Sequence, residues 1–112
     1  MMRRKLAAGN WKMNGTAADL AELEALSRTY PSPSVDVLIC PPATLIHRAA
    51  QTVGDAAIMI GGQDCHTALS GAHTGDISAQ MLMDAGASMV RPCIGPVLRK
   101  YPATGIHREL EG

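Results

Sequence analysis

The sequence predicts an α/β fold in which parallel strands alternate with helices, and three observations support this. Short apolar runs typical of strands covered on both faces alternate with segments of helical periodicity. The apolar share is 46%, yet one Trp and two Tyr are the only aromatic residues, so Leu, Ile, Val, Met and Ala must build the core. Such a core suits closely packed helix-on-sheet layers better than a sandwich of strands. A length of 112 residues allows one domain and not two.

The first predicted strand ends in a polar sequence. Residues 6–8 are apolar and lead into residues 9–15, Gly-Asn-Trp-Lys-Met-Asn-Gly. Strand alternation would place Asn10 and Lys12 on one face and Trp11 on the other. The carboxyl ends of parallel strands are where α/β sheets bind ligands. Taken alone, Lys12 is more often a solvated surface charge than a fixed cation for an anionic substrate.

A helix is expected over residues 16–28, followed by a second strand. Thr16 with Asp19 three residues later resembles a capping box, and leucines at helical spacing supply an apolar face. Pro-Ser-Pro-Ser at residues 31–34 ends this helix. The apolar run at residues 35–40 then predicts a strand buried on both faces.

A second helix and a third strand follow the same pattern. Pro42 suits a first helical turn, the apolar residues up to Val53 keep a period of 3.6, and Gly54 can close the helix. The run at residues 57–60 predicts the third strand, which ends at Gly-Gly-Gln-Asp.

The last part of the pattern is a polar, Gly-rich loop and a short helix. The loop covers residues 65–76, Ser78 can cap the helix, and residues 86–90 begin a fourth strand. Repeated βα units predict a parallel sheet with right-handed crossovers. This alternation occurs in flavodoxin-like sheets and in (β/α)₈ barrels alike, so it does not choose between them.

Composition argues against several classes of function. Ten basic and ten acidic side chains cancel, and no basic stripe suggests nucleic-acid binding. No apolar run approaches the roughly 20 residues that cross a membrane, and the basic start is followed by too few apolar residues for a signal peptide. Three cysteines without a CxxC pair indicate reduced thiols and a cytoplasmic protein. Cys65, His66 and His73 match no trusted metal-ligand spacing.

Four segments, in order, resemble the triosephosphate isomerase family. They are residues 9–15, already described, 62–65 (Gly-Gln-Asp-Cys), 71–78 (Gly-Ala-His-Thr-Gly-Asp-Ile-Ser) and 81–87 (Met-Leu-Met-Asp-Ala-Gly-Ala). The resemblance covers about residues 3–90. Two departures are mild: Asp64 stands where the family more often has Asn, and Asp76 where it more often has Glu.

The resemblance implies a TIM (β/α)₈ barrel of which residues 1–90 supply about the first four βα units. It implies interconversion of dihydroxyacetone phosphate and glyceraldehyde 3-phosphate through an enediolate, without cofactor or metal. Lys12 would be catalytic, binding the small phosphorylated substrate and stabilising negative charge on its oxygens. Asn10 would bind the substrate and position the ammonium group.

The resemblance also implies a homodimer. Thr74, Gly75 and Asp76 would insert into a second subunit and support its active site. Gln63 and Asp64 would lie near the mouth of the barrel and help place the first-strand residues. An equally weighted alternative is that Gln63 and Asp64 only satisfy nearby backbone groups.

Residues 91–112 form a tail that does not match the family. The family continues with Gly-His-Ser-Glu-Arg-Arg, whereas Pro92 and Pro96 would interrupt a central strand here. His107 has no surrounding match and is not taken as the catalytic histidine. This change of character suggests a truncated or frame-shifted coding sequence or disorder, with an unrelated extension as the alternative. The family's base, lid and most phosphate-binding loops belong to its second half.

The isolated chain is therefore expected to be inactive. Two other readings stay open at this stage. One is a noncatalytic half-barrel that binds a partner or another copy of itself. The other is a small doubly wound α/β binding protein, which would carry helices on both faces of an open sheet.

Overall fold

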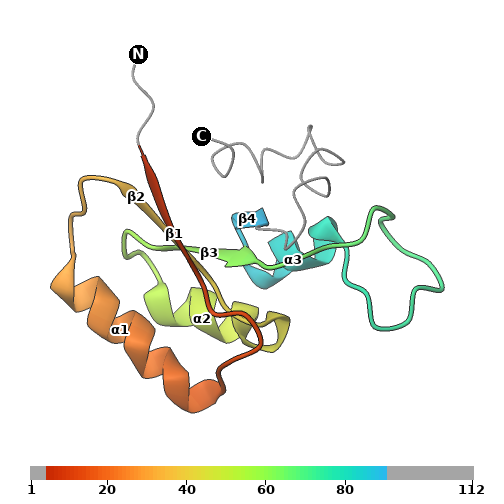
Figure 1. The fold of residues 1–112 in the computed structure, drawn as a ribbon, viewed down its shortest axis with the longest axis horizontal. Helices are drawn as coiled ribbons and strands as arrows, with labels where there is room; N and C mark the ends of the chain where they lie inside the picture. Colours follow the sequence, from red (N-terminus) through yellow and green to blue (C-terminus); the bar gives the residue numbers. More distant parts are fainter. Residues whose placement is uncertain (1–4, 91–112) are drawn as a thin grey trace.

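The computed structural model describes residues 5–90, which form one four-stranded parallel sheet and the helices packed against it (Figure 1). The strand order β1-β2-β3-β4 follows the chain. The elements are β1 (Leu6–Asn10), η1 (Ala17–Asp19), α1 (Leu20–Thr29), β2 (Asp36–Cys40), η2 (Ala43–Leu45), α2 (Ile46–Val53), β3 (Met59–Gly62), α3 (Ala79–Ala85) and β4 (Met89–Val90). The predicted alternation of strand and helix is therefore confirmed.

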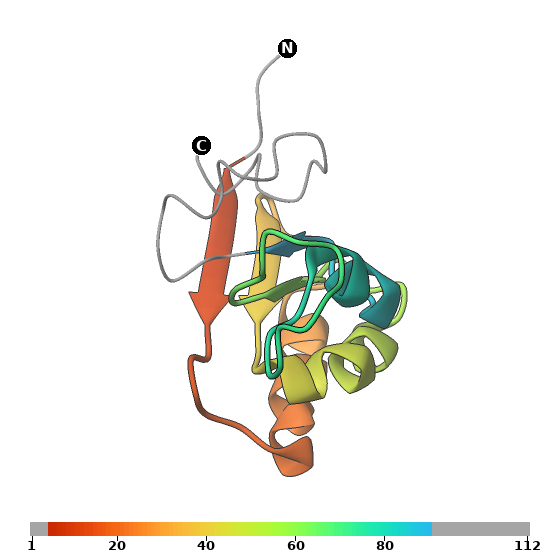
Figure 2. The same ribbon diagram turned by 90° about the vertical axis from the view of Figure 1, so that its right-hand side faces the viewer.

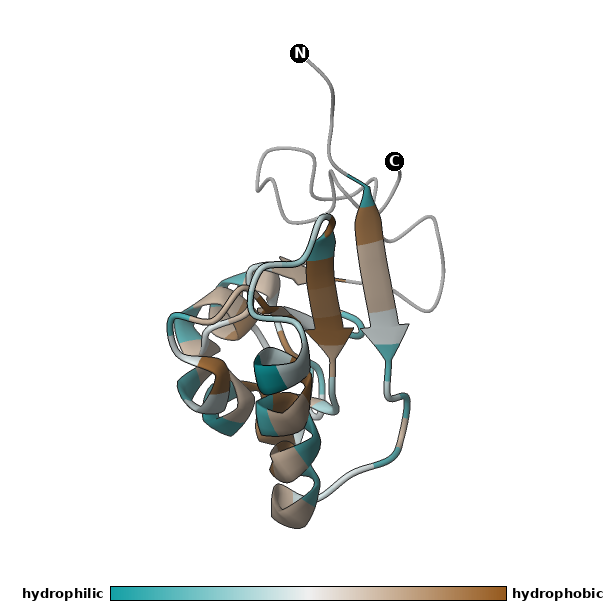
Figure 3. Cartoon of the chain, turned by 90° about the vertical axis from the view of Figure 1, so that its left-hand side faces the viewer, coloured by the Kyte–Doolittle hydropathy of each residue, from teal (hydrophilic) through white to brown (hydrophobic). Residues whose placement is uncertain are grey.

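The helices cover one side of the sheet. Figures 2 and 3 show α1, α2 and α3 on the same side of the β1–β2 pair. A Cβ on Gly62 would lie 2.8 Å from Leu82 of α3, so this residue faces the helices. A doubly wound sheet would have helices on both faces, and the described chain does not.

The opposite face of the sheet carries a different set of side chains. A Cβ on Gly61 would lie 2.9 Å from Leu38 Cδ1 and 3.1 Å from Cys40 Sγ, so these three residues share the face away from the helices. Asn10 is paired in register with Cys40. Because partners in register point to the same side, Asn10 also lies on the face away from the helices.

Part of the core lies between the sheet and the helices, and Leu38 and Cys40 of β2 are buried on the other face of the sheet. Leu23 of α1, Ile46 and Ala49 of α2 and Leu82 of α3 are buried together with Ile60 of β3. Burying one such Leu or Ile side chain contributes roughly 1.5–3 kcal/mol relative to leaving it exposed. In Figure 3 most of β2 has the colour of hydrophobic residues, whereas the helices carry both hydrophilic and hydrophobic residues.

The helix ends follow the signals read from the sequence. The Thr16 N–H donates to the Asp19 carboxylate at 2.7 Å, and the Ser78 hydroxyl accepts the Met81 N–H at 3.1 Å. Gly54 is the C-cap of α2, with φ of 52°. These contacts satisfy backbone groups that a helix end leaves without partners.

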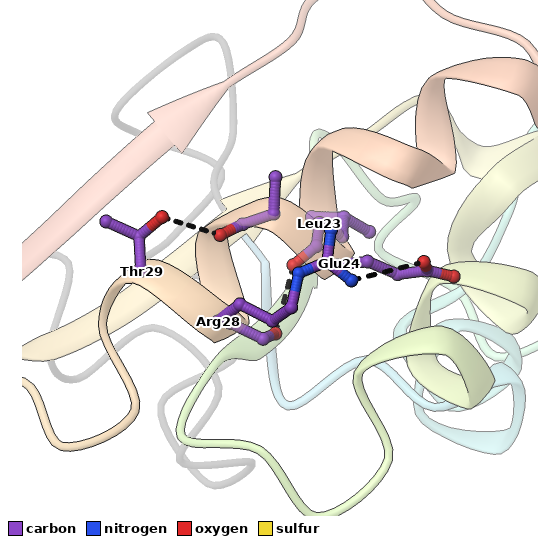
Figure 4. A network of polar contacts seen from close by, with 6 residues as sticks. Leu23, Glu24, Arg28 and Thr29 are labelled. Carbon is purple, nitrogen blue, oxygen red and sulfur yellow. Dashed lines mark hydrogen bonds and ion pairs between the residues drawn. The ribbon is translucent and has the colours of Figure 1, made fainter.

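Local polar contacts lie at the exposed C-terminal end of α1 (Figure 4). Arg28 lies 3.9 Å from the Glu24 carboxylate, and the Thr29 hydroxyl donates to the Ala25 carbonyl at 2.8 Å. Both residues of the ion pair are largely exposed, so this pair adds at most about 0.5 kcal/mol.

The strand boundaries differ from the sequence expectation at two places. The third strand runs from Met59 to Gly62 rather than over 57–60, and β4 begins at Met89 rather than at residue 86. The fourth strand starts later than expected because residues 86 and 87 still belong to the end of α3. Gly86 ends the helix in the left-handed region, and the Ala87 N–H donates to the Leu82 carbonyl. The tail at 91–112 lies outside the described residues. Within residues 5–90 no helix is long and apolar enough to cross a membrane.

Candidate functional site

The end of β1 places a polar side chain beside the end of β2. Asn10 is the last residue of β1, and the Trp11 N–H continues the ladder by donating to the Cys40 carbonyl at 3.0 Å. Trp11 belongs to the helix side, because its ring lies 3.1 Å from the position of a Cβ on Gly15, next to Leu45. Asn10 and Trp11 therefore separate to opposite faces.

Lys12 follows the strand and does not continue it. Its φ is 58°, and it is the only residue other than glycine with positive φ in the described part of the chain. Its N–H turns back to the Asn10 side-chain oxygen at 2.8 Å. Strand alternation, on which the sequence argument placed Asn10 and Lys12 together, stops at Asn10; a left-handed turn brings the two residues into contact instead.

Gln63 fixes the other side of the Lys12 backbone. Its Nε2 donates to the Lys12 carbonyl at 2.8 Å and to the Cys40 carbonyl at 3.0 Å. One half-buried amide therefore joins the ends of three neighbouring strands. This agrees with the predicted role of Gln63 in placing the first-strand residues, and the role of the Cys40 carbonyl was not predicted because a backbone acceptor leaves no signal in sequence.

Asp64 fits the alternative interpretation, in which its side chain only satisfies nearby backbone groups. Its side chain is exposed, and its carboxylate accepts the N–H of the next residue, Cys65, at 2.8 Å. This is a local contact that satisfies the backbone at the end of β3 and makes no hydrogen bond to the first-strand segment.

The arrangement presents hydrogen-bond donors at the carboxyl end of the sheet. The Asn10 oxygen is occupied by the Lys12 N–H, while its Nδ2 has no hydrogen-bond partner within residues 5–90. The Lys12 side chain is exposed and brings a positive charge to the same segment. A donor and a cation whose backbone is held in advance suit a ligand that carries or develops negative charge.

The loop between β3 and α3 projects from the body of the molecule (Figure 1). Thr74, Gly75 and Asp76 are exposed, and the Asp76 N–H donates to the His73 carbonyl at 3.0 Å. No hydrogen bond joins these three residues to Asn10 or Lys12 in the described chain. The structure therefore brings Asn10, Lys12 and Gln63 together and leaves the loop residues apart from them.

A cavity of about 400 Å³ lies under this loop. Its lining includes Gln63, Asp64, His66, Gly75 and Asp76. No group of three or more His, Cys, Asp or Glu residues within 5–90 is placed to hold a metal ion.

Fold and site together define a barrel-type α/β protein. Four parallel strands carry their helices on one side and end in a Lys–Asn pair at the carboxyl edge, as in the first half of a (β/α)₈ barrel. The triosephosphate isomerase family model matches residues 5–92. The chain therefore belongs to the triosephosphate isomerase family.

Individual relatives agree with this assignment. The chain is 65% identical over 89 residues to a triosephosphate isomerase of Ruegeria pomeroyi and 68% identical over 89 residues to one of a second Ruegeria strain. These alignments cover 80% of this chain but only 36% and 35% of the relatives, so it spans about a third of their length. The crystal structure of the Bartonella henselae triosephosphate isomerase matches with a TM-score of 0.74 and 50% identity, over 78% of this chain and 36% of that one.

Proposed function

We propose that this chain is the substrate-binding N-terminal part of a triosephosphate isomerase that interconverts dihydroxyacetone phosphate and glyceraldehyde 3-phosphate. The proposal rests on one observation, namely that hydrogen bonds hold the Lys12 backbone at both its N–H and its carbonyl. Its N–H is bonded to Asn10 and its carbonyl to Gln63, both at 2.8 Å. A surface lysine needs no such support, whereas a catalytic cation must be held in a fixed position.

The proposed chemistry is a proton transfer next to a carbonyl group. Removal of that proton leaves an enediolate, whose negative charge lies on the two substrate oxygens. The Lys12 ammonium stabilises that charge, and the Asn10 Nδ2 donates a hydrogen bond to the substrate. Neither role needs a cofactor or a metal ion. The base and the acid that move the protons would come from the part of the barrel that the relatives have beyond this match.

The proposed assembly is a homodimer in the cytoplasm. Thr74, Gly75 and Asp76 are exposed on a projecting loop, as a segment that inserts into a second subunit must be. Cys40 and Cys65 are buried thiols in the described chain, which fits a reducing compartment.

The test is a chimera in which residues 5–90 of this chain replace the matching residues of the Ruegeria pomeroyi relative, called here the barrel chimera. We expect it to be an active isomerase. Replacing Lys12→Ala in it should lower kcat/KM by about 100-fold or more, the size of effect seen when a charge-stabilising donor is removed.

Lys5→Ala is the matched control, because Lys5 lies just before the opposite end of the same strand, where its carbonyl accepts the Asp36 N–H. This variant should keep kcat/KM within about twofold of the unmodified chimera, since surface substitutions away from a site have little effect. An equal loss in the two lysine variants, or a folded chimera without activity, would refute the proposed role of Lys12.

A further inference from the structure

Two histidines are stacked within the loop that follows β3. The ring centroids of His66 and His73 lie 4.0 Å apart and the ring planes meet at 27°. His66 is tied to the body of the protein, because its N–H donates to the Ile77 carbonyl at 2.8 Å and it pairs with Ser78. His73 is exposed and lies in the middle of the loop. The stack therefore links the loop to its own base.

This arrangement uses His66 in its neutral form. The Ala68 N–H donates to His66 Nδ1 at 2.9 Å, and only a ring nitrogen without a proton can accept that hydrogen bond. Protonation of His66 removes the acceptor and leaves the Ala68 N–H without it. Protonation of both rings also places two positive charges face to face at 4.0 Å, where they repel each other.

The loop backbone at Gly71 is packed closely on the His73 ring. A Cβ on Gly71 would lie 2.9 Å from His73 Nε2, and Gly71 has φ of 141°. The His73 ring is therefore close to the Gly71 backbone as well as stacked on the His66 ring. Movement of His73 would change the backbone on the outward part of the loop as well.

Nearby charged groups do not replace the hydrogen bond and the ring contact that protonation of His66 removes. A second, smaller cavity is lined by both histidines and by Asp76. The cavity of about 400 Å³ described above is lined by Asp64 and Cys65 together with His66. No nitrogen of either histidine lies within 4.0 Å of a carboxylate in the described chain. Ser78, the N-cap of α3, and Met81 within α3 also line the cavity beside both histidines, and both are uncharged.

We propose that the His66–His73 stack is a pH-sensitive latch that holds the loop at residues 65–76 at neutral pH and releases it on protonation. Histidine is the side chain that ordinarily changes charge between about pH 5 and about pH 8. Both contacts of His66, one to the Ala68 N–H and one to the His73 ring, depend on the uncharged form of the imidazole. The inference concerns the loop alone and stands whether or not the chain takes part in catalysis.

The test is an NMR titration of the intact 112-residue chain, labelled with ¹⁵N, from about pH 8 to about pH 5. Imidazole nitrogen shifts should show unprotonated Nδ1 in His66 at the start. As His66 takes up a proton, the protection factor of the Ala68 amide, corrected for the intrinsic pH dependence of exchange, should fall by about tenfold, a change equivalent to about 1.4 kcal/mol. The amides of residues 69–75 should shift over the same range.

Three single variants and one double variant separate the latch from a general effect of acid. His66→Phe should leave the Ala68 amide unprotected at both ends of the titration. His73→Phe should keep the response of the Ala68 amide and abolish that of residues 69–75. His47→Gln removes an exposed histidine of α2 and should leave the whole response unchanged. The same loop response in a His66→Phe/His73→Phe variant, or an unchanged Ala68 amide while His66 protonates, would overturn the proposal.

Discussion

At the scale of single residues, the site depends on one strained backbone position. A left-handed conformation costs a residue with a Cβ roughly 1–2 kcal/mol. Lys12 adopts this conformation with φ of 58° while its N–H donates to the Asn10 side-chain oxygen and its carbonyl accepts from the Gln63 amide. Strain of this kind persists only where the surroundings determine it, and it concentrates at functional sites.

The first prediction uses the strain at Lys12. In the barrel chimera, Lys12→Gly should raise the free energy of unfolding by roughly 1 kcal/mol relative to Lys12→Ala, because glycine has no Cβ to strain the left-handed turn. Both variants should lose isomerase activity to the same degree. Urea unfolding of the two variants measures the difference, and equal stability would show that the turn is not strained.

The second prediction concerns the amide that joins three strand ends. Gln63→Leu removes the donor to the Lys12 and Cys40 carbonyls and should destabilise the barrel chimera by roughly 1–3 kcal/mol. It should also lower kcat, since the Lys12 turn loses one of its two supports. Gln51→Leu on the exposed side of α2 is the control and should change neither quantity. Full activity in Gln63→Leu would remove Gln63 from the supports of the site.

At the scale of elements, the contact between α2 and α3 depends on a glycine. Gly86 ends α3 with φ of 114°, and a Cβ there would lie 2.6 Å from the Ala50 Cβ of α2. Two separate costs therefore fall on one position: the left-handed backbone and a collision between two helices that cover the sheet.

The third prediction separates those two costs. Gly86→Ala should destabilise the barrel chimera by roughly 2–4 kcal/mol, the sum of backbone strain and overpacking. In an Ala50→Gly background the same substitution should cost only roughly 1–2 kcal/mol, because the collision is gone and the backbone strain remains. A double-mutant cycle measured by urea unfolding gives the coupling. Additive effects would mean that the helices move apart at no cost.

Most elements, but fewer boundaries, could be predicted from the sequence. Thr16, Gly54 and Ser78 carry local signals, and each is found at the helix end that it predicts. Strand ends have weaker signals, because pairing decides them: β3 runs on through two glycines that face close neighbours on either side. The turn at Lys12 was missed for a related reason, since one of its two supports is a hydrogen bond from Gln63, 51 positions away.

At the scale of the whole molecule, the described chain is a part of a barrel. A closed (β/α)₈ barrel takes about 250 residues, and the matched relatives have about three times the length that this chain covers. β1 and β4 are the outer strands of the described sheet, whereas a closed barrel pairs every strand on both sides. The motifs near residues 9–15 and 71–78 indicated the family without this information, because each is a run of specific residues in the sequence.

The last prediction follows from that incomplete barrel. The isolated 112-residue chain should show no isomerase turnover, because catalytic groups that act as a unit lose most of their rate when some of them are missing. In the role proposed for it, Lys12 stabilises an enediolate only after a base has formed one. The measurement is a coupled assay with either triose phosphate, using protein purified from a host that lacks its own isomerase. Turnover that disappears in Lys12→Ala would show that the chain carries a complete active site and would contradict this prediction.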